Sequence, residues 1–247
     1  MKVVIMGMGQ VGQPFKELCE EAGHKVYIIE KDSEDKREGK IDVMLVNIPY
    51  NEEFVDIASN KIKEVNPEMV IINSTVDVGV TRRIEETTKT PTIHSPVRGL
   101  HPNLKKGIKT FVKYIGATDP DKAEKAMEFL EGLGLKTRVF NNPEETEMFK
   151  LLSTTQYGIY IALATEIKKI CDKYKLDFDN VYTDGNVTYN IGYMELGIPN
   201  VIRPTLKPNK GGISGHCVWE NTQILGDKLD KTWKSHIDKI GKAKKEL

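Results

Sequence analysis

The residue of this sequence best suited to covalent chemistry is Cys217, which lies in the glycine-rich segment 207–221. A thiolate is a strong nucleophile, and the neighbouring His216 stabilises one when its imidazole is charged and close to the sulfur. The glycines of the segment, Gly215 among them, let a ligand approach the backbone closely. We therefore predict Cys217 as a catalytic residue, with Gly215 and His216 contacting the substrate. The alternative is a glycine-rich turn beside an ordinary buried cysteine.

Lys150 and Thr154 form a second pair of candidate catalytic residues. They lie in the stretch 143–175, which we predict to be one long helix with Asn142 as its N-cap. Residues four positions apart share one face of a helix, so both side chains can reach one ligand. A lysine placed there can stabilise a developing oxyanion or move a proton. A solvated lysine on a helix surface is the alternative interpretation.

Three further cations are candidates for binding an anionic group of a substrate, because arginine and lysine pair with carboxylates and phosphates. They are Arg98, Arg203 and Lys207. Such residues are also typical of an ordinary protein surface. We retain Arg98 and Lys207 as predicted substrate-binding residues.

Residues 2–30 have the pattern of a dinucleotide-binding unit: an apolar strand, a glycine-rich loop, a helix, a second strand and an acid. In the loop, Gly7 permits a tight turn, Gly9 lets the backbone approach a pyrophosphate, and Gly12 lets the helix pack closely on the strand. The start of the helix offers free N–H groups to the phosphates. Glu30 follows Gly12 by 18 residues, where a carboxylate accepts hydrogen bonds from ribose hydroxyls. The cofactor is therefore predicted to be NAD rather than NADP, and the alternative is a similar turn without a dinucleotide.

The elements that must position these residues alternate between strand and helix. Further strands are predicted at 42–48, 68–73, 90–93, 111–117 and 136–140, with helices between them. This order indicates an α/β fold with a doubly wound parallel sheet of the Rossmann type, whose ligands lie outside the carboxyl ends of the strands. The predicted cofactor-binding residues therefore combine the loop with later strand ends: Gly7, Gly9, Gln10, Val11, Gly12, Glu30, Ile48, Pro49, Ser74 and Thr75.

The pattern changes after residue 142. Helices are predicted at 143–175, 179–196 and 218–240, with a loop at 201–216. We therefore predict an NAD-binding Rossmann domain at 1–142 and a smaller all-helical domain at 143–247 for substrate binding and dimerisation.

Composition excludes several other classes of protein. The chain has 247 residues, of which 39% are hydrophobic and 29% charged, and its 36 basic residues balance 36 acidic ones. Nucleic-acid binding is not expected without a basic excess. Three cysteines without a C-x-x-C motif argue against a zinc site or a disulfide framework and favour a reducing, cytoplasmic environment. No leader and no apolar run of membrane-spanning length is recognisable, so no membrane partner is expected.

Four blocks of sequence together resemble the nucleotide-sugar dehydrogenases, the UDP-glucose/GDP-mannose/UDP-N-acetylmannosamine group. These enzymes are related to the 6-phosphogluconate and 3-hydroxyisobutyrate dehydrogenases. The blocks are the glycine loop, Asn73-Ser74-Thr75-Val76 with Gly79, Thr146-Glu147-Met148-Phe149-Lys150, and Ile213-Ser214-Gly215-His216-Cys217. They occur in the family's order and spacing over residues 1 to about 225.

The resemblance implies a mechanism and an assembly. Lys150 matches the family's catalytic lysine and Cys217 its nucleophile. In that family an alcohol is oxidised to an aldehyde, the thiol captures the aldehyde as a thiohemiacetal, and a second oxidation gives a thioester that water hydrolyses, so that two NAD are used. The segment 162–166 is similar to the family's dimerisation helix and implies a homodimer.

The chain also departs from the family pattern. Val97 replaces a carboxylate thought to assist hydrolysis, Thr154 replaces an asparagine, and Asn221 replaces an acid four residues after the cysteine. We nevertheless take Thr154 and Asn221 as candidate catalytic residues. The family continues into a UDP-binding domain, whereas this sequence stops at Leu247. The resemblance therefore implies either a short form or a substrate that is not a standard UDP-sugar.

Three functions remain open at this point. The first is NAD-dependent oxidation of a primary alcohol of a sugar or nucleotide-sugar-like molecule through Cys217. The second is a single-step oxidation of a hydroxy acid, of the 3-hydroxyisobutyrate type, in which Cys217 takes no part. The third is a dinucleotide-binding protein without turnover.

Overall fold

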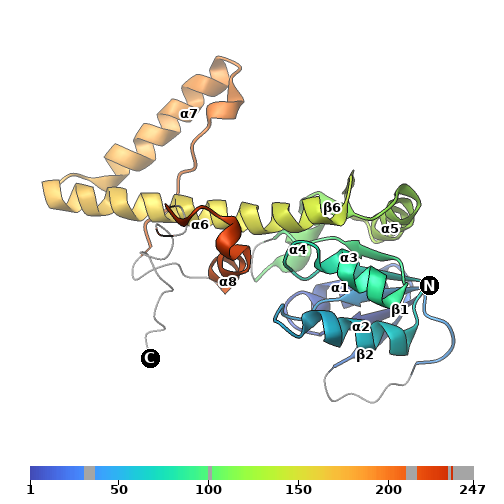
Figure 1. Ribbon diagram of the computed structural model, residues 1–247. Coiled ribbons are helices and arrows are strands. Elements are labelled where there is room, and N and C mark those ends of the chain that lie inside the picture. The colour runs from blue at the N-terminus through green and yellow to red at the C-terminus, as the bar shows by residue number, and fades with distance from the viewer. Residues whose placement is uncertain (31–36, 100–101, 210–215, 233–234, 236–247) are drawn as a thin grey trace. The chain divides into compact units, whose positions relative to one another are not determined.

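The chain forms two compact units, which we describe separately. The computed structural model describes residues 1–30, 37–99, 102–209, 216–232 and 235, without the side chains of residues 216, 217 and 227. The units are Met1–Lys150 and Leu151–Leu247, and the boundary between them falls inside the 32-residue helix α6, Pro143–Tyr174 (Figure 1). The predicted boundary at 142/143 coincides with the start of this helix.

The first unit contains a seven-stranded sheet in the order β2-β1-β3-β4-β5-β6-β7. The strands are β1 Lys2–Met6, β2 Lys25–Ile29, β3 Val43–Val46, β4 Met69–Ile72, β5 Thr92–His94, β6 Lys113–Gly116 and β7 Thr137–Phe140. Strands β1 to β5 are parallel, as predicted. The expectation of a wholly parallel sheet is wrong at β6, which runs antiparallel to β5 and parallel to β7.

The reversal at β6 arises in the connection that follows β5. This connection contains α4, Leu104–Thr110, a seven-residue helix that the sequence did not predict. The chain turns back beyond the end of β5, so that His94 pairs with Gly116 in antiparallel register. As a result, β6 begins at the end of the sheet that carries the carboxyl ends of β1 to β5.

Helices cover both faces of the sheet, as the doubly wound prediction requires. Helices α1 (Gly12–Glu21), α4 and α5 (Pro120–Gly132) share a buried apolar core on one face, and α2 (Phe54–Val65) and α3 (Val80–Thr88) share a core on the other. Successive side chains of a strand point to opposite faces. Val3 and Ile5 of β1 accordingly enter the first core, while Val4 enters the second. Each such buried side chain contributes about 1.5–3 kcal/mol.

Cys19 belongs to the first core and has no contact with solvent. Burial in apolar surroundings raises the pKa of its thiol to about 12, with a smaller contribution from the charge of Glu20. Cys171, on the second half of α6, is also a buried free thiol. These two cysteines therefore serve packing rather than chemistry.

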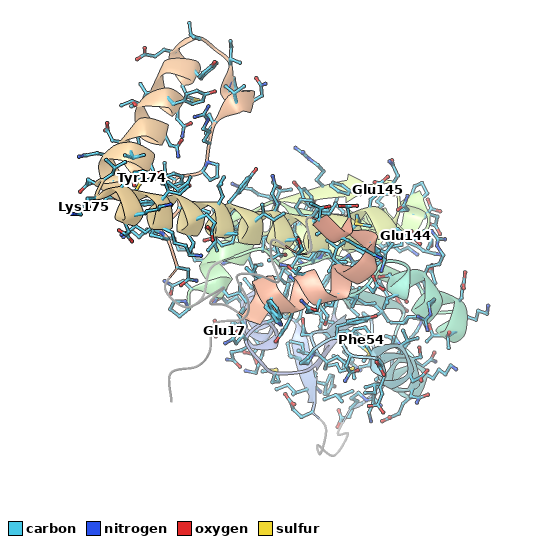
Figure 2. The ribbon with its side chains drawn as sticks, turned by 60° about the vertical axis from the view of Figure 1, so that its left-hand side comes forward. Glu17, Phe54, Glu144, Glu145, Tyr174 and Lys175 are labelled. Carbon is cyan, nitrogen blue, oxygen red and sulfur yellow. The ribbon has the colours of Figure 1, made fainter. Side chains whose placement is uncertain are left out.

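The second unit is helical. It contains the second part of α6: Glu144 and Glu145, near the start of this helix, belong to the first unit, whereas Tyr174 and Lys175, at its far end, belong to the second (Figure 2). A π-helical turn at Asp179–Asp184 leads into α7, Gly185–Glu195, and α8 spans His216–Leu225. None of the helices that the structure describes is long and apolar enough to cross a lipid bilayer.

The predicted helix at 218–240 is interrupted rather than continuous, because α8 ends at Leu225 and the described residues are α-helical again only at Lys231, Thr232 and Ser235. Gly226 adopts a φ of +50°, a left-handed conformation that stops an α-helix and that glycine adopts without strain. A short 3₁₀ turn, Gly226–Lys228, follows, and Leu229 is extended. Residues 236–240 lie outside the described part of the chain.

Candidate functional site

The glycine loop lies at the point where the strand order of the sheet reverses. Strand β1 is flanked by β2 and β3, so a crevice is expected outside the carboxyl ends of β1 and β3. Gly7 follows β1 directly with φ of +87°, and a Cβ on it would lie 2.9 Å from Ile48 Cγ2 and 3.0 Å from the Asn47 carbonyl oxygen. A Cβ on Gly12 would lie 1.9 Å from the Gly7 carbonyl oxygen. Both positions therefore require glycine for the fold itself.

Gly9 differs from these two residues. A Cβ built on it would meet no atom within 4 Å, so the surrounding protein leaves space next to its backbone. Helix α1 begins just beyond, with no side-chain cap on its N-terminus and no acidic residue in its first turn. Free N–H groups and the helix dipole favour an anionic group at such a helix start. The loop thus fits the pyrophosphate of a dinucleotide.

Glu30 lies at the rim of the same loop. Its carboxylate follows β2 and accepts a hydrogen bond from the Met8 N–H at 2.5 Å, while the side chain is exposed. A carboxylate held here can accept hydrogen bonds from ribose hydroxyls and would repel a 2′-phosphate. The predicted residues Gln10 and Val11 lie in the intervening loop and are exposed and partly exposed.

Hydrogen bonds join the carboxyl ends of β3 and β4 beside this loop. The Ser74 hydroxyl donates to the Ile48 carbonyl oxygen at 2.7 Å, and Asn73 Nδ2 donates to Asn47 Oδ1 at 3.0 Å. The structure therefore brings the predicted Ile48 and Ser74 together at one edge of the sheet. Pro49 and Thr75 adjoin them in sequence.

Glu147 connects helix α6 to the segment that follows β4. Its buried carboxylate accepts three hydrogen bonds: from the Gly79 N–H at 2.7 Å, the Thr81 N–H at 2.8 Å and the Thr81 hydroxyl at 2.6 Å. These donors belong to the N-terminus of α3, so Glu147 caps that helix from another element. Burial raises the pKa of the Glu147 carboxyl, and the three hydrogen bonds oppose the rise.

The motif that contains Glu147 did not predict this capping role. The available signal was the absence of a capping side chain at Gly79 itself. One turn earlier, Glu144 pairs with Arg82 of α3 through two bonds of 2.6 and 3.0 Å. Two successive turns of α6 are therefore bound to α3.

Lys150 is held at the carboxyl edge of the sheet. Its ammonium donates to the Val97 carbonyl oxygen at 2.9 Å, just beyond β5. The Arg98 guanidinium lies 4.3 Å from the Tyr114 ring centroid and donates to the Val112 carbonyl oxygen. These contacts orient Arg98 within the protein, and its binding of substrate stays a prediction.

The predicted residues of the second unit form one direct contact. Asn221 of α8 is buried and its Nδ2 donates to the Thr154 hydroxyl of α6 at 2.9 Å. Thr155 and Thr222 approach each other within 3.3 Å one position along. The family's asparagine and acid are thus replaced here by a hydrogen-bonded pair that holds α8 on α6.

The remaining candidates of this unit divide into two groups. The backbone of His216 and Cys217 forms the first turn of α8, whereas their side chains and the whole of Gly215 lie outside the described residues. Lys207 is exposed in an irregular segment. The guanidinium of Arg203 lies 3.5 Å from the Tyr189 ring centroid.

Comparison with known proteins finds dehydrogenases among the similar sequences and structures. No family model matches the chain. The UDP-N-acetyl-D-mannosamine dehydrogenase of Methanocaldococcus jannaschii is 28% identical over 157 residues, covering 62% of this chain and 34% of the relative. That of Methanococcus maripaludis is 28% identical over 153 residues, covering 61% and 33%. The match thus spans about a third of the length of these curated relatives.

Solved structures show the same fold. The UDP-D-ManNAc dehydrogenase from Pyrococcus horikoshii superposes with a TM-score of 0.75 at 18% identity, covering 97% of this chain and 69% of that one. The 3-hydroxyisobutyrate dehydrogenase of Mycobacterium tuberculosis gives 0.72 at 14% identity, covering 96% and 91%. The fold is an N-terminal Rossmann domain with a helical domain after it. The predicted resemblance to nucleotide-sugar dehydrogenases is confirmed by the curated relatives, which are UDP-N-acetyl-D-mannosamine dehydrogenases.

His94, the last residue of β5, is fully buried near the carboxyl ends of the parallel strands. Its Nδ1 lies 2.8 Å from the Thr146 hydroxyl and its Nε2 lies 3.2 Å from the Ser74 carbonyl oxygen. Burial lowers the pKa of His94 to about 3, although the Ser74 hydrogen bond opposes this, and the charges of Lys113 and Lys150 lower it further. The imidazole is therefore neutral at physiological pH.

This neutral histidine predicts acid sensitivity. Between pH 6.5 and about 3 the unfolded chain binds a proton at His94 that the folded chain does not, so stability falls as the pH decreases. The slope is at most about 1.4 kcal/mol per pH unit. Substituting His94→Gln should flatten the plot of unfolding free energy against pH in this range, measured by urea denaturation. Burial also lowers the pKa of the partly exposed His24, so His24→Gln should flatten the plot less than His94→Gln does. An unchanged slope in His94→Gln would contradict the assignment.

Proposed function

We propose that this chain is an NAD-dependent dehydrogenase that oxidises a primary alcohol of a sugar or of a nucleotide-sugar-like molecule. The observation that carries the proposal is the glycine loop at the β1/β3 reversal. There, Gly7 and Gly12 are sterically required, whereas the space beside Gly9 is open. The class of substrate is supported by the UDP-N-acetyl-D-mannosamine dehydrogenases among the relatives.

Each part of the first unit has a role in this proposal. Bound NAD would supply the hydride acceptor. The backbone around Gly9 and the start of α1 would hold its pyrophosphate, and Glu30 would accept hydrogen bonds from its ribose hydroxyls. Lys150 would donate a hydrogen bond to the substrate oxygen and stabilise negative charge that develops on it. Its contact with the Val97 carbonyl oxygen keeps the ammonium at the edge of the sheet.

Cys217 is the proposed nucleophile toward the aldehyde product. Its sulfur would bond to the carbonyl carbon while the thiol proton passes to the carbonyl oxygen, which gives a thiohemiacetal. Oxidation of the thiohemiacetal, with a second NAD as hydride acceptor, would give a thioester, and hydrolysis by water would then yield the acid and restore the thiol. Asn221 and Thr154 would act by holding α8, whose first turn contains Cys217. Gly215, His216, Arg98 and Lys207 are the proposed substrate contacts.

One observation favours a simpler second candidate. Val97 is an apolar side chain, 7% exposed, at the position where the family has a carboxylate thought to assist hydrolysis. Without that carboxylate, a single oxidation of a hydroxy acid needs fewer catalytic groups than conversion of an alcohol to an acid. The product therefore distinguishes the two candidates.

The cofactor choice is testable at Glu30. Substituting Glu30→Gln removes a charged acceptor for ribose hydroxyls, so NAD affinity should fall about tenfold while NADP affinity stays constant or rises. Fluorescence titration with NADH and NADPH measures both affinities. Glu124→Gln, at an exposed position of α5, is the matched control. Unchanged affinity for both cofactors would remove Glu30 from the site.

The role of Cys217 is testable by product stoichiometry. The wild type should form two NADH per substrate consumed, and Cys217→Ala should form no acid while binding NAD with nearly unchanged affinity. Cys171→Ala, at a buried thiol, is the control. One NADH per substrate, unaffected by Cys217→Ala, would favour the hydroxy-acid candidate. Tight NADH binding without turnover on a broad panel of alcohols and sugars would instead indicate a non-catalytic protein.

We also propose a homodimer formed through the second unit. Its helices expose large apolar side chains to solvent, including Leu163 and Ile170 on α6, each 54% exposed. Groups of such side chains commonly mark protein–protein interfaces. Light scattering should give twice the mass of one chain, and Leu163→Glu with Ile170→Glu should shift the protein toward monomer. Ile57→Glu, at an exposed isoleucine of α2, should not; a monomeric wild type would disprove the dimer.

A further inference from the structure

Lys113, the first residue of β6, is a buried cation that the proposed function leaves unexplained. Lys113 is only 3% exposed to solvent. Its ammonium donates hydrogen bonds to the carbonyl oxygen of Ser95 and, at 3.4 Å, to that of Pro96. It also lies 5.2 Å from the centroid of the Phe15 ring. Burial lowers the pKa of Lys113 well below its ordinary value, and the charges of Lys150 and Arg98 lower it further.

A lysine in this setting does not serve stability well. Buried charges cost free energy to desolvate, and even a complete buried ion pair can often be replaced by apolar residues of similar size without loss of stability. The charged groups that most affect Lys113 are themselves cations, and carbonyl oxygens compensate only part of the cost. Its position in the fold therefore points to another role.

The reversal of β6 places Lys113 at the end of the sheet where strands β1 to β5 have their carboxyl ends. Because β6 is antiparallel to β5, the residues after His94 run back along those that precede Gly116. The Ser95 hydroxyl accordingly donates to the Tyr114 carbonyl oxygen at 2.7 Å. Had β6 been parallel to β5, its first residue would lie at the other end of the sheet, where β1 to β5 begin.

Three successive carbonyl groups of the segment 95–97 hold two lysines. Ser95 and Pro96 accept from Lys113, and Val97 accepts from Lys150 at 2.9 Å. The first lysine thereby fixes the backbone that positions the second. We propose that Lys113 is a positioning residue: it braces the segment 95–97 so that the Val97 carbonyl group holds the Lys150 ammonium in place.

This inference rests on the proposed role of Lys150. A group that stabilises charge on a reacting oxygen must be accurately placed, and a displacement of about 1 Å can lower the rate about 100-fold. Loss of Lys113 should therefore reduce kcat more than it changes KM. Cofactor affinity should not change, because the groups to which the Lys113 side chain is bound, Ser95 and Pro96, are not predicted cofactor-binding residues.

The first experiment measures the brace without requiring turnover. Amide hydrogen exchange of peptides covering residues 95–99 should be slowest in the wild type, faster in Lys113→Gln, which keeps a donor, and fastest in Lys113→Met, which keeps none. The melting temperature of Lys113→Met should be equal to or above that of the wild type. Lys136→Met removes an exposed lysine just before β7 and should match the wild type.

The second experiment asks whether Lys113 acts through Lys150. Lys113→Met should lower kcat about 100-fold in the wild type but cause no further loss in a Lys150→Met background. An equal loss in both backgrounds would show that Lys113 acts independently, and would overturn the inference. Exchange at 95–99 that is the same in all variants would overturn it as well, and so would failure of both Lys113 variants to fold.

The failure of the proposed function gives a different result. If Lys150→Met leaves turnover unchanged, or the wild type turns over no alcohol, Lys150 lacks its proposed role. The exchange measurement still decides whether Lys113 braces the segment 95–97. The two failures are therefore distinguishable.

Discussion

The buried carboxylate of Glu147 is the contact on which the arrangement of the site depends. Removing it from water is costly, and only its three hydrogen bonds to the start of α3 make its burial tolerable. Those bonds fix both the rotation and the height of α6 against the segment after β4. Because a helix turns by about 100° per residue, a shift of one position would carry Lys150 away from the Val97 carbonyl group. The hydrogen bonds that Glu147 makes to α3 therefore also determine where Lys150 lies.

Backbone geometry imposes the other constraint. Gly7 and Gly12 let the loop after β1 fold tightly against neighbouring backbone, and the same tight fold leaves Gly9 accessible. The loop and the lysine are built differently. The loop relies on missing side chains, so its shape follows from local sequence. The lysine relies on contacts between elements far apart in the chain, so its placement follows from tertiary packing.

This difference explains which predictions succeeded. The strands β1 to β5 and helix α6 follow from local periodicity, and the glycine loop follows from residue types at adjacent positions. The reversal at β6 and the short helix α4 were missed, because strand direction depends on how a connection packs and seven residues carry little periodic signal. The roles of Glu147 and Lys113 could not be predicted either, because their partners lie 66–68 and 17–18 positions away. The interruption of the last predicted helix at Gly226 was also missed, although glycine is typical just after the end of a helix.

The burial of Cys19 and Cys171 shields both thiols from reagents in the native protein. Cys19 is sealed in the sheet core with its pKa raised to about 12, and Cys171 is equally shielded in α6. A thiol with a pKa as high as that of Cys19 forms almost no thiolate at neutral pH, and electrophiles react with the thiolate. Alkylating reagents, redox-active metabolites and covalent inhibitors should therefore react with Cys19 and Cys171 only when the packing around them opens. The labelling rates of Cys19 and Cys171 would report how often the packing around each of them opens in the native protein.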